Sequence, residues 1–142
     1  MAAGTNPIFF AAVHNEFAHA DGDGGSSGPI KTANTNLDGS GTLLTLWTAT
    51  ANGGGVRKVM LRPAGTNILT VARFFVYDGT NTQLVDELTL QATTAVANQG
   101  QQPYIWVPTD GWQPMKASHV LKMTLGTTVS AGYLPSAIGG DY

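Results

Sequence analysis

The chain has 142 residues, no cysteine and a net charge of −2, with seven basic and nine acidic residues. This length indicates one domain that can bury its own core, and the lack of cysteine excludes disulfides, thiolate metal sites and cysteine nucleophiles. Charged residues are only 11% of the chain, so it has no broad positive field for nucleic acid or an anionic membrane.

The first residues, MAAGTNPIFFAAVHNE, contain no basic segment and only a short apolar run. We therefore expect no signal peptide. No stretch of the sequence approaches the 18 or more apolar residues of a membrane-spanning helix. These features predict a soluble protein that is made in the cytosol.

Residues 1–28 have the composition of an N-terminal arm and a linker. IFFAAVHNEF is apolar enough to form a short strand, and the ADGDGGSSG that follows is glycine-rich and typical of a turn or linker. We expect this irregular arm to lie on a neighbouring subunit or a target. Its predicted contact residues are Ile8, Phe9, Phe10 and Phe17.

The remaining residues, 29–142, form the predicted β domain. Glycine and proline interrupt it about every ten residues, and short β-rich runs lie between them. The predicted strands are 42–50, 55–62, 68–77, 83–91, 103–107, 118–125 and 128–134, with a further pairing segment near 29–35. This pattern predicts an all-β fold, an antiparallel β-sandwich that is jelly-roll-like. The long polar connection at 92–102 is a second expected contact region.

The strand that contains RKVMLR is predicted to have two different faces. Val59 and Leu61 point to one face, whereas Lys58 and Arg62 point to the other. Alternation separates Arg57 from these two basic residues. Apolar residues recur on both faces of such strands, which is typical of a sheet that another subunit covers. We expect Lys58 and Arg62 to contact acidic groups of a partner protein or of a sister protomer, with a solvated face as the alternative.

The carboxylates of TVARFFVYDGTNTQLVDELTL do not form a catalytic pair. Asp78 belongs to a turn, because Asp-Gly is a strong hairpin signal. Asp86 and Glu87 are consecutive in a strand and therefore point to opposite faces of the sheet. We expect Arg73 to pair with Asp86 across the hairpin. No catalytic residue is predicted.

The candidate metal ligands do not match known spacings, and no metal or cofactor is expected. His14, Glu16 and His19 lack the H-E-x-x-H arrangement, because the histidines are five residues apart. DGDGG does not supply the ligands of an EF-hand loop. A looser cation site at Asp21 and Asp23 remains an alternative.

Aromatic residues divide between the core and the surface. Tyr104 and Trp106 share one face of a short strand, with Ile105 and Val107 opposite, so one of these pairs must lie in the core. Trp112 follows a Thr-Asp-Gly turn and is the aromatic residue we expect to be most exposed. It is the candidate for stacking on a glycan.

A resemblance to a known class of protein runs from Trp47 to the end of the chain, over about residues 43–142. Its segments are GVRKVMLRPAGTN, TVARFFVYDGTNTQLVDELTL and WVPTDGWQPMKASHVLKMTLGTTVSAGYLPSAIGGDY. This pattern resembles small virion proteins of tailed bacteriophages, in particular the jelly-roll decoration (cement) proteins that sit as trimers on the capsid. Similar sheets occur in tail and fibre components.

The resemblance implies a structural virion protein and not an enzyme. Such a protein lies on the outer surface of the capsid, forms a homotrimer, and bridges neighbouring copies of the major capsid protein without binding nucleic acid or membrane. The acidic groups that Lys58 and Arg62 contact would then belong to a capsid subunit or to a sister protomer. The main alternative is a receptor- or glycan-binding module of a tail fibre or baseplate, with Trp112 as its contact residue. A tail-completion or connector component is a third reading.

Overall fold

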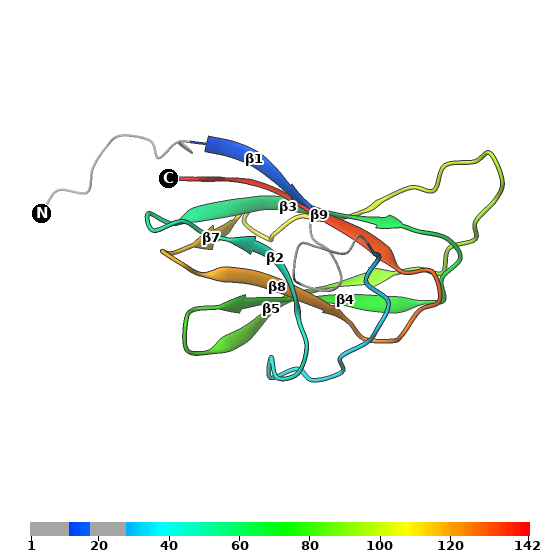
Figure 1. The fold of residues 1–142 in the computed structure, drawn as a ribbon, viewed down its shortest axis with the longest axis horizontal. Helices are drawn as coiled ribbons and strands as arrows, with labels where there is room; N and C mark the ends of the chain where they lie inside the picture. Colours follow the sequence, from blue (N-terminus) through cyan, green and yellow to red (C-terminus); the bar gives the residue numbers. More distant parts are fainter. Residues whose placement is uncertain (1–11, 18–27) are drawn as a thin grey trace, which may run out of the picture.

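The computed structural model describes the backbone of residues 12–17 and, with side chains, residues 28–142. These parts of the chain contain strands and no helix (Figure 1). The strands are β1 (Ala12–Phe17), β2 (Leu44–Thr48), β3 (Gly54–Pro63), β4 (Thr70–Tyr77), β5 (Thr82–Leu90), β6 (Tyr104–Trp106), β7 (Gln113–Met115), β8 (Val120–Leu125) and β9 (Tyr133–Asp141). In the part of the chain that is described, no helix could cross a membrane.

The strands form two antiparallel sheets that pack face to face, so the predicted β-sandwich is confirmed. The first sheet has the order β1-β9-β3-β6, and β7 also pairs with β3. The second sheet has the order β2-β8-β4-β5. Alternation along the strands explains this arrangement, because Val59 and Leu61 of β3 and Leu121 and Met123 of β8 are fully buried between the sheets.

The strand predicted at 128–134 is wrong, because the last strand is β9, farther along the chain. Glycines conceal it in the sequence. Gly139 lies so close to β3 that an added Cβ would overlap the carbonyl oxygen of Gly55. Glycine therefore serves here to bring two central strands together, although in a sequence it usually indicates a turn. β7 was also not predicted, since its middle residue is Pro114.

The N-terminal strand lies on the chain's own first sheet. β1 pairs with β9 in antiparallel register, from Ala12 opposite Asp141 to Phe17 opposite Ser136. The predicted contact residues Ile8, Phe9 and Phe10 lie outside the described residues, and of the fourth, Phe17, only the backbone is described, so these contacts stay predictions.

Both open sides of the sandwich are closed by links between the sheets. On one side, residues 29–34 pass from the first sheet, where Ile30 pairs with Tyr133, to the second, where Ala33 pairs with Leu125. The predicted pairing segment near 29–35 is thereby confirmed. On the other side, Trp106 of β6 stacks on Phe74 of β4, with ring centroids 4.1 Å apart.

Candidate protein-interaction surfaces

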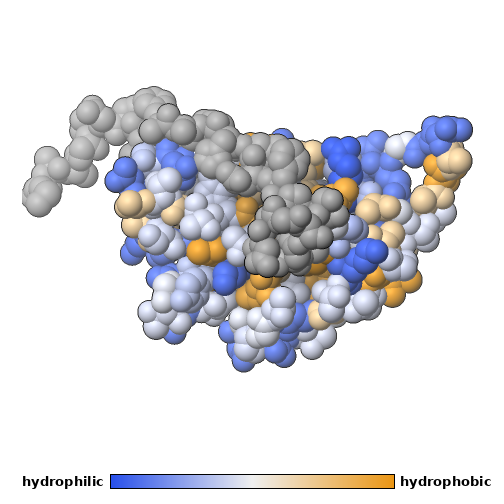
Figure 2. All heavy atoms as spheres, viewed as in Figure 1, coloured by the Kyte–Doolittle hydropathy of each residue, from blue (hydrophilic) through white to orange (hydrophobic). Residues whose placement is uncertain are grey.

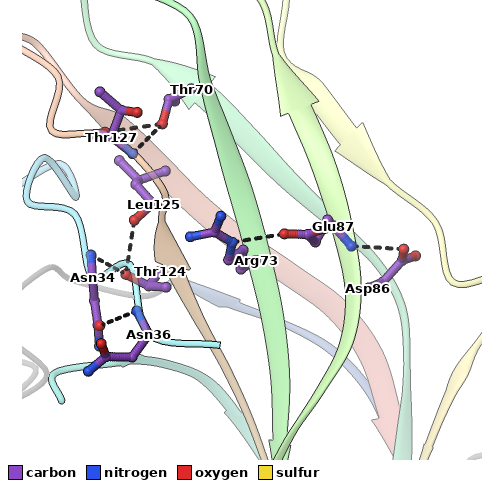
Figure 3. A network of polar contacts seen from close by, with 9 residues as sticks. All are labelled: Asn34, Asn36, Thr70, Arg73, Asp86, Glu87, Thr124, Leu125 and Thr127. Atoms are coloured by element: carbon purple, nitrogen blue, oxygen red, sulfur yellow. Dashed lines mark hydrogen bonds and ion pairs between the residues drawn. The ribbon is translucent and has the colours of Figure 1, made fainter. Parts of the chain in front are cut away.

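Arg73 pairs with Glu87 and not with Asp86, so the predicted partner is wrong. Nε of Arg73 donates a hydrogen bond to Oε1 of Glu87 at 2.8 Å, and the two residues are opposite one another in the register. Asp86 lies opposite the buried Phe74 and accepts a hydrogen bond from Nε1 of Trp106 at 2.7 Å. The two carboxylates point to opposite sides of β5, as predicted, and Figure 3 shows Asp86 turned away from Arg73.

Turn geometry accounts for two other carboxylates. Asp78 accepts hydrogen bonds from the amides of Asn81 at 2.7 Å and Thr80 at 2.9 Å, and these bonds lower its pKa below the usual value of 3.8. Asp38 accepts from the hydroxyl and the amide of Ser40, which lowers its pKa in the same way. Hydrogen bonds to the charged form favour ionisation, so both groups act as structural anions.

No metal centre is found in the described part of the chain, where no three His, Cys, Asp or Glu side chains lie together. His19, Asp21 and Asp23 lie outside that part, and His14 and Glu16 belong to β1, of which only the backbone is described. The cation site at Asp21 and Asp23 therefore stays a prediction.

The outer side of the first sheet combines aliphatic and basic residues, and we call it the basic face. Its described residues are Arg57, Lys58, Met60 and Arg62 of β3, Ile105 of β6, Val107 just after it, and Leu134 and Ile138 of β9. The side chain of Ile105 is 48% exposed and that of Leu134 is 44% exposed. None of the residues named for this face is acidic.

A β-bulge in β3 brings a third basic residue to the basic face. The register with β9 shifts between Val56 and Lys58, so Arg57 is an extra residue in β3. Val56 and Val59 are both fully buried in the core. Arg57 and Lys58 therefore both lie away from the core, and the predicted separation of Arg57 from Lys58 is wrong. Strict alternation cannot foresee a bulge.

Neither Lys58 nor Arg62 forms an ion pair with a carboxylate of the described residues. Arg62 is exposed and Lys58 is half-buried. The two predicted contact residues are brought to one face, as the sequence indicated.

One end of the sandwich is built from three loops, and we call it the loop end. The loops are 64–69, 91–103 and 126–132. They meet because the strands that they connect end together: Pro63 pairs with Tyr133, Leu61 with Tyr104, and Thr70 with Leu90. The loop 91–103 projects farthest from the body of the molecule, at the upper right of Figure 1. It contains the predicted contact region 92–102.

The buried Asn67 joins the three loops. Its Oδ1 accepts hydrogen bonds from the amides of Gly132 at 2.7 Å and Ala131 at 3.0 Å, and its Nδ2 donates to the carbonyl of Gly132. Its backbone exchanges two hydrogen bonds with Thr93.

Further hydrogen bonds also join the loops. They run from Ser130 Oγ to Thr66 O, from the Ala95 amide to Thr66 Oγ1, and from Gln101 Nε2 to Gly65 O. The loop end is thus one connected unit.

Aliphatic side chains protrude from the loop end. Ile68 is 59% exposed, Leu69 is 54% exposed and Val96 is 53% exposed. A cleft of about 380 Å³ opens among residues 93–104, between polar side chains such as Gln99 and Gln102. The sequence prediction missed Ile68 and Leu69, because an aliphatic pair before a strand looks like part of that strand.

The aromatic residues of the described region are mostly internal. Trp106 is buried and Tyr104 packs against the core, so Ile105 and Val107 are the outward pair. Trp112 is 37% exposed, and its ring lies edge-on to that of Tyr142, with centroids 6.3 Å apart. Trp112 stands before β7, away from the loop end.

Comparisons of the chain with models of protein families, with curated proteins and with solved structures find no match.

Proposed function

We propose that this chain is a non-enzymatic structural protein of a bacteriophage virion, which decorates the outside of the head and bridges neighbouring capsid subunits. The basic face is the observation that carries the proposal. It combines exposed aliphatic side chains with arginine and methionine. Arginine and methionine are enriched in the cores of protein interfaces.

The polar chemistry of the described residues supports a binding role over a catalytic one. The carboxylates of Asp38, Asp78, Asp86 and Glu87 each hold a turn or a strand in place through the hydrogen bonds given above. A general acid or base needs a carboxylate that is poised for a substrate proton. The backbone of a sheet face is already ordered by its hydrogen bonds, so it loses little entropy on binding, which favours a docking surface.

The proposed mechanism is the free energy of association. A standard interface buries about 1,600 Å² in total. Cations on the basic face would contact acidic groups of the capsid subunit and speed association, while the aliphatic residues supply apolar burial. If several copies act together, release requires all of them to detach, so multivalency prolongs attachment. Capsid subunits bridged in this way would then resist the outward pressure of the packaged genome.

A binding experiment with undecorated phage heads tests the proposal. Purified heads are mixed with the protein, and bound protein is measured by co-sedimentation over a range of concentrations. We expect saturation at a fixed ratio to the capsid protein. Arg62→Glu should raise the dissociation constant about tenfold, equal to about 1.4 kcal/mol. Lys116→Glu is the matched control, since Lys116 is also exposed but lies outside the basic face.

Two results would count against decoration. One is a lack of saturable binding to heads by the wild-type protein. The other is an equal loss of binding in the Arg62 and Lys116 variants, which would mean that only net charge matters.

The exposed ring of Trp112 favours a second candidate, a glycan-binding module of a tail fibre or baseplate. Its indole is the most exposed among the described tryptophans, and aromatic rings stack on sugars. A glycan array with wild type and Trp112→Ala tests this alternative. Specific binding that is lost in the variant, without any binding to heads, would replace the decoration role.

A further inference from the structure

We propose that the loop end is the surface through which copies of this chain bind one another. The inference goes beyond the proposed function, because it holds whether or not the chain binds phage heads. It rests on three properties of the loop end: its charge, its exposed aliphatic residues and its internal hydrogen bonds.

The three loops contain no charged residue. Residues 64–69, 91–103 and 126–132 have no Asp, Glu, Lys, Arg or His, although charged residues make up 11% of the chain. The opposite end differs, since its connections include Asp78, Asp110 and Lys116. Lys31 and Arg62 border the loop end without belonging to the loops. Charge is therefore unevenly distributed between the two ends of the sandwich.

This distribution of charge indicates which kind of partner suits the loop end. In a two-fold symmetric dimer, the same surface patch of both copies meets. The basic face is unsuited to this, because two copies would bring Lys58 and Arg62 close to the same cations of the other copy, and like charges in contact oppose association. A surface without charge meets a copy of itself without that penalty. The loop end is therefore suited to self-association and the basic face to a partner of opposite charge.

The exposed side chains favour a protein over a sugar at this end. Ile68, Leu69 and Val96 are each more than half exposed, and all are aliphatic. Removing aliphatic surface from water favours association. Glycans stack on aromatic faces, and the one tyrosine beside the cleft, Tyr104, packs against the core and donates its hydroxyl to Gln91 O at 3.0 Å. Figure 2 shows apolar and hydrophilic spheres together at the projecting tip, upper right.

The loop end is organised before any partner arrives. The hydrogen bonds of Asn67 fix loops 64–69 and 126–132 to each other, and Thr93 fixes the long loop to both. Residues that are already ordered pay less entropy on association. The hollow among residues 93–104 and the protruding Ile68 and Leu69 give this end both concave and convex parts. A second copy therefore meets a surface whose shape is already set by these hydrogen bonds.

The test is the molar mass of the full chain in solution, measured by sedimentation velocity over a hundredfold range of concentration. We expect the wild type to form a closed oligomer that dissociates on dilution. The double variant Ile68→Glu/Val96→Glu should raise the dissociation constant at least about tenfold, because each glutamate would be buried without a partner. Both side chains are more than half exposed in one copy, so the variant should keep the wild-type urea midpoint.

The double variant Ile105→Glu/Leu134→Glu is the matched control. It places the same two charges at exposed aliphatic positions of the basic face, and it should leave self-association unchanged while altering head binding. The inference is overturned by a wild-type monomer at all concentrations, including a monomer that binds a neutral glycan at this end. It is also overturned if the control variant dissociates the oligomer and the loop-end variant does not. Loss of head binding with intact self-association would instead concern the proposed function.

Discussion

Nε1 of Trp106 donates a hydrogen bond of 2.7 Å to Oδ2 of Asp86, and this bond connects the two sheets of the sandwich. Trp106 belongs to β6 at the edge of the first sheet, and Asp86 belongs to β5 at the edge of the second. The same indole stacks on Phe74. The carboxylate of Asp86 thus has a structural role.

Changing Asp86 should lower stability through Trp106. Asp86→Ala leaves the buried indole N–H without an acceptor, which costs about 1–3 kcal/mol. Asp86→Asn keeps an oxygen at this position and should lose less than half as much. Urea unfolding followed by tryptophan fluorescence measures both. If Asp86→Ala unfolds at the wild-type midpoint, the bond does not hold the sheets together.

Asn67 should be the most sensitive polar residue of the loop end. Asn67→Ala removes the acceptor for two backbone amides and a donor to Gly132, so we expect a loss of about 2–4 kcal/mol. Asn67→Asp retains the acceptor and should fall between the alanine variant and the wild type. Thermal unfolding of both variants provides the measurement, and equal stability of the alanine variant and the wild type would contradict it.

The turn carboxylates Asp38 and Asp78 should make the free energy of unfolding decrease in acid. The folded-state pKa values of Asp38 and Asp78 are lowered, so the folded form binds their protons less tightly than the unfolded form. Their contribution is present above the usual pKa of 3.8 and is lost as pH falls through the lowered values. Asp38→Asn/Asp78→Asn keeps the turn oxygens without titration, and its loss of stability in acid should be shallower. Parallel slopes for variant and wild type, in urea midpoints between about pH 5 and pH 2, would refute this.

Two N-terminal truncations should distinguish the contribution of β1 to stability from that of the residues before it. Deleting residues 1–20 removes the six paired residues of β1 and opens the edge of β9, so stability should fall by several hydrogen bonds at about 0.5–1.5 kcal/mol each. Deleting residues 1–11 leaves β1 in place. The difference in unfolding free energy between the two truncations measures the contribution of β1. No difference would show that β1 adds nothing to the sandwich.

The arm's predicted contact residues are tested separately. Changing Ile8, Phe9 and Phe10 together to alanine leaves every described strand intact, and we expect weaker binding to undecorated heads with an unchanged urea midpoint. Co-sedimentation with heads measures this. Wild-type head binding by the triple variant would remove the arm from the contact surface.

Much of the fold could be predicted because alternation is a local signal. From Lys58 to Arg62, β3 buries every second residue, Val59 and Leu61, so the two faces of this part of the strand were assigned correctly from the sequence. β9 could not be found in this way, since its glycines serve close approach to β3 and resemble a turn in sequence.

The candidate sites were harder to predict, because they depend on the register between neighbouring strands. Lys58 and Arg62 share one strand, so their common face followed from spacing alone. The extra residue Arg57 in β3 and the pairing of Arg73 with Glu87 depend on how neighbouring strands align. The loop end depends on long-range register as well, because its three loops are far apart in the sequence.

Cryo-electron microscopy of the intact phage particle tests the decoration role most directly, because it measures both where the chain lies and how many copies are present. Decoration predicts hundreds of copies spread over the outer shell, with the basic face against the capsid protein. A few copies at one vertex or along the tail, and none on the shell, would contradict it.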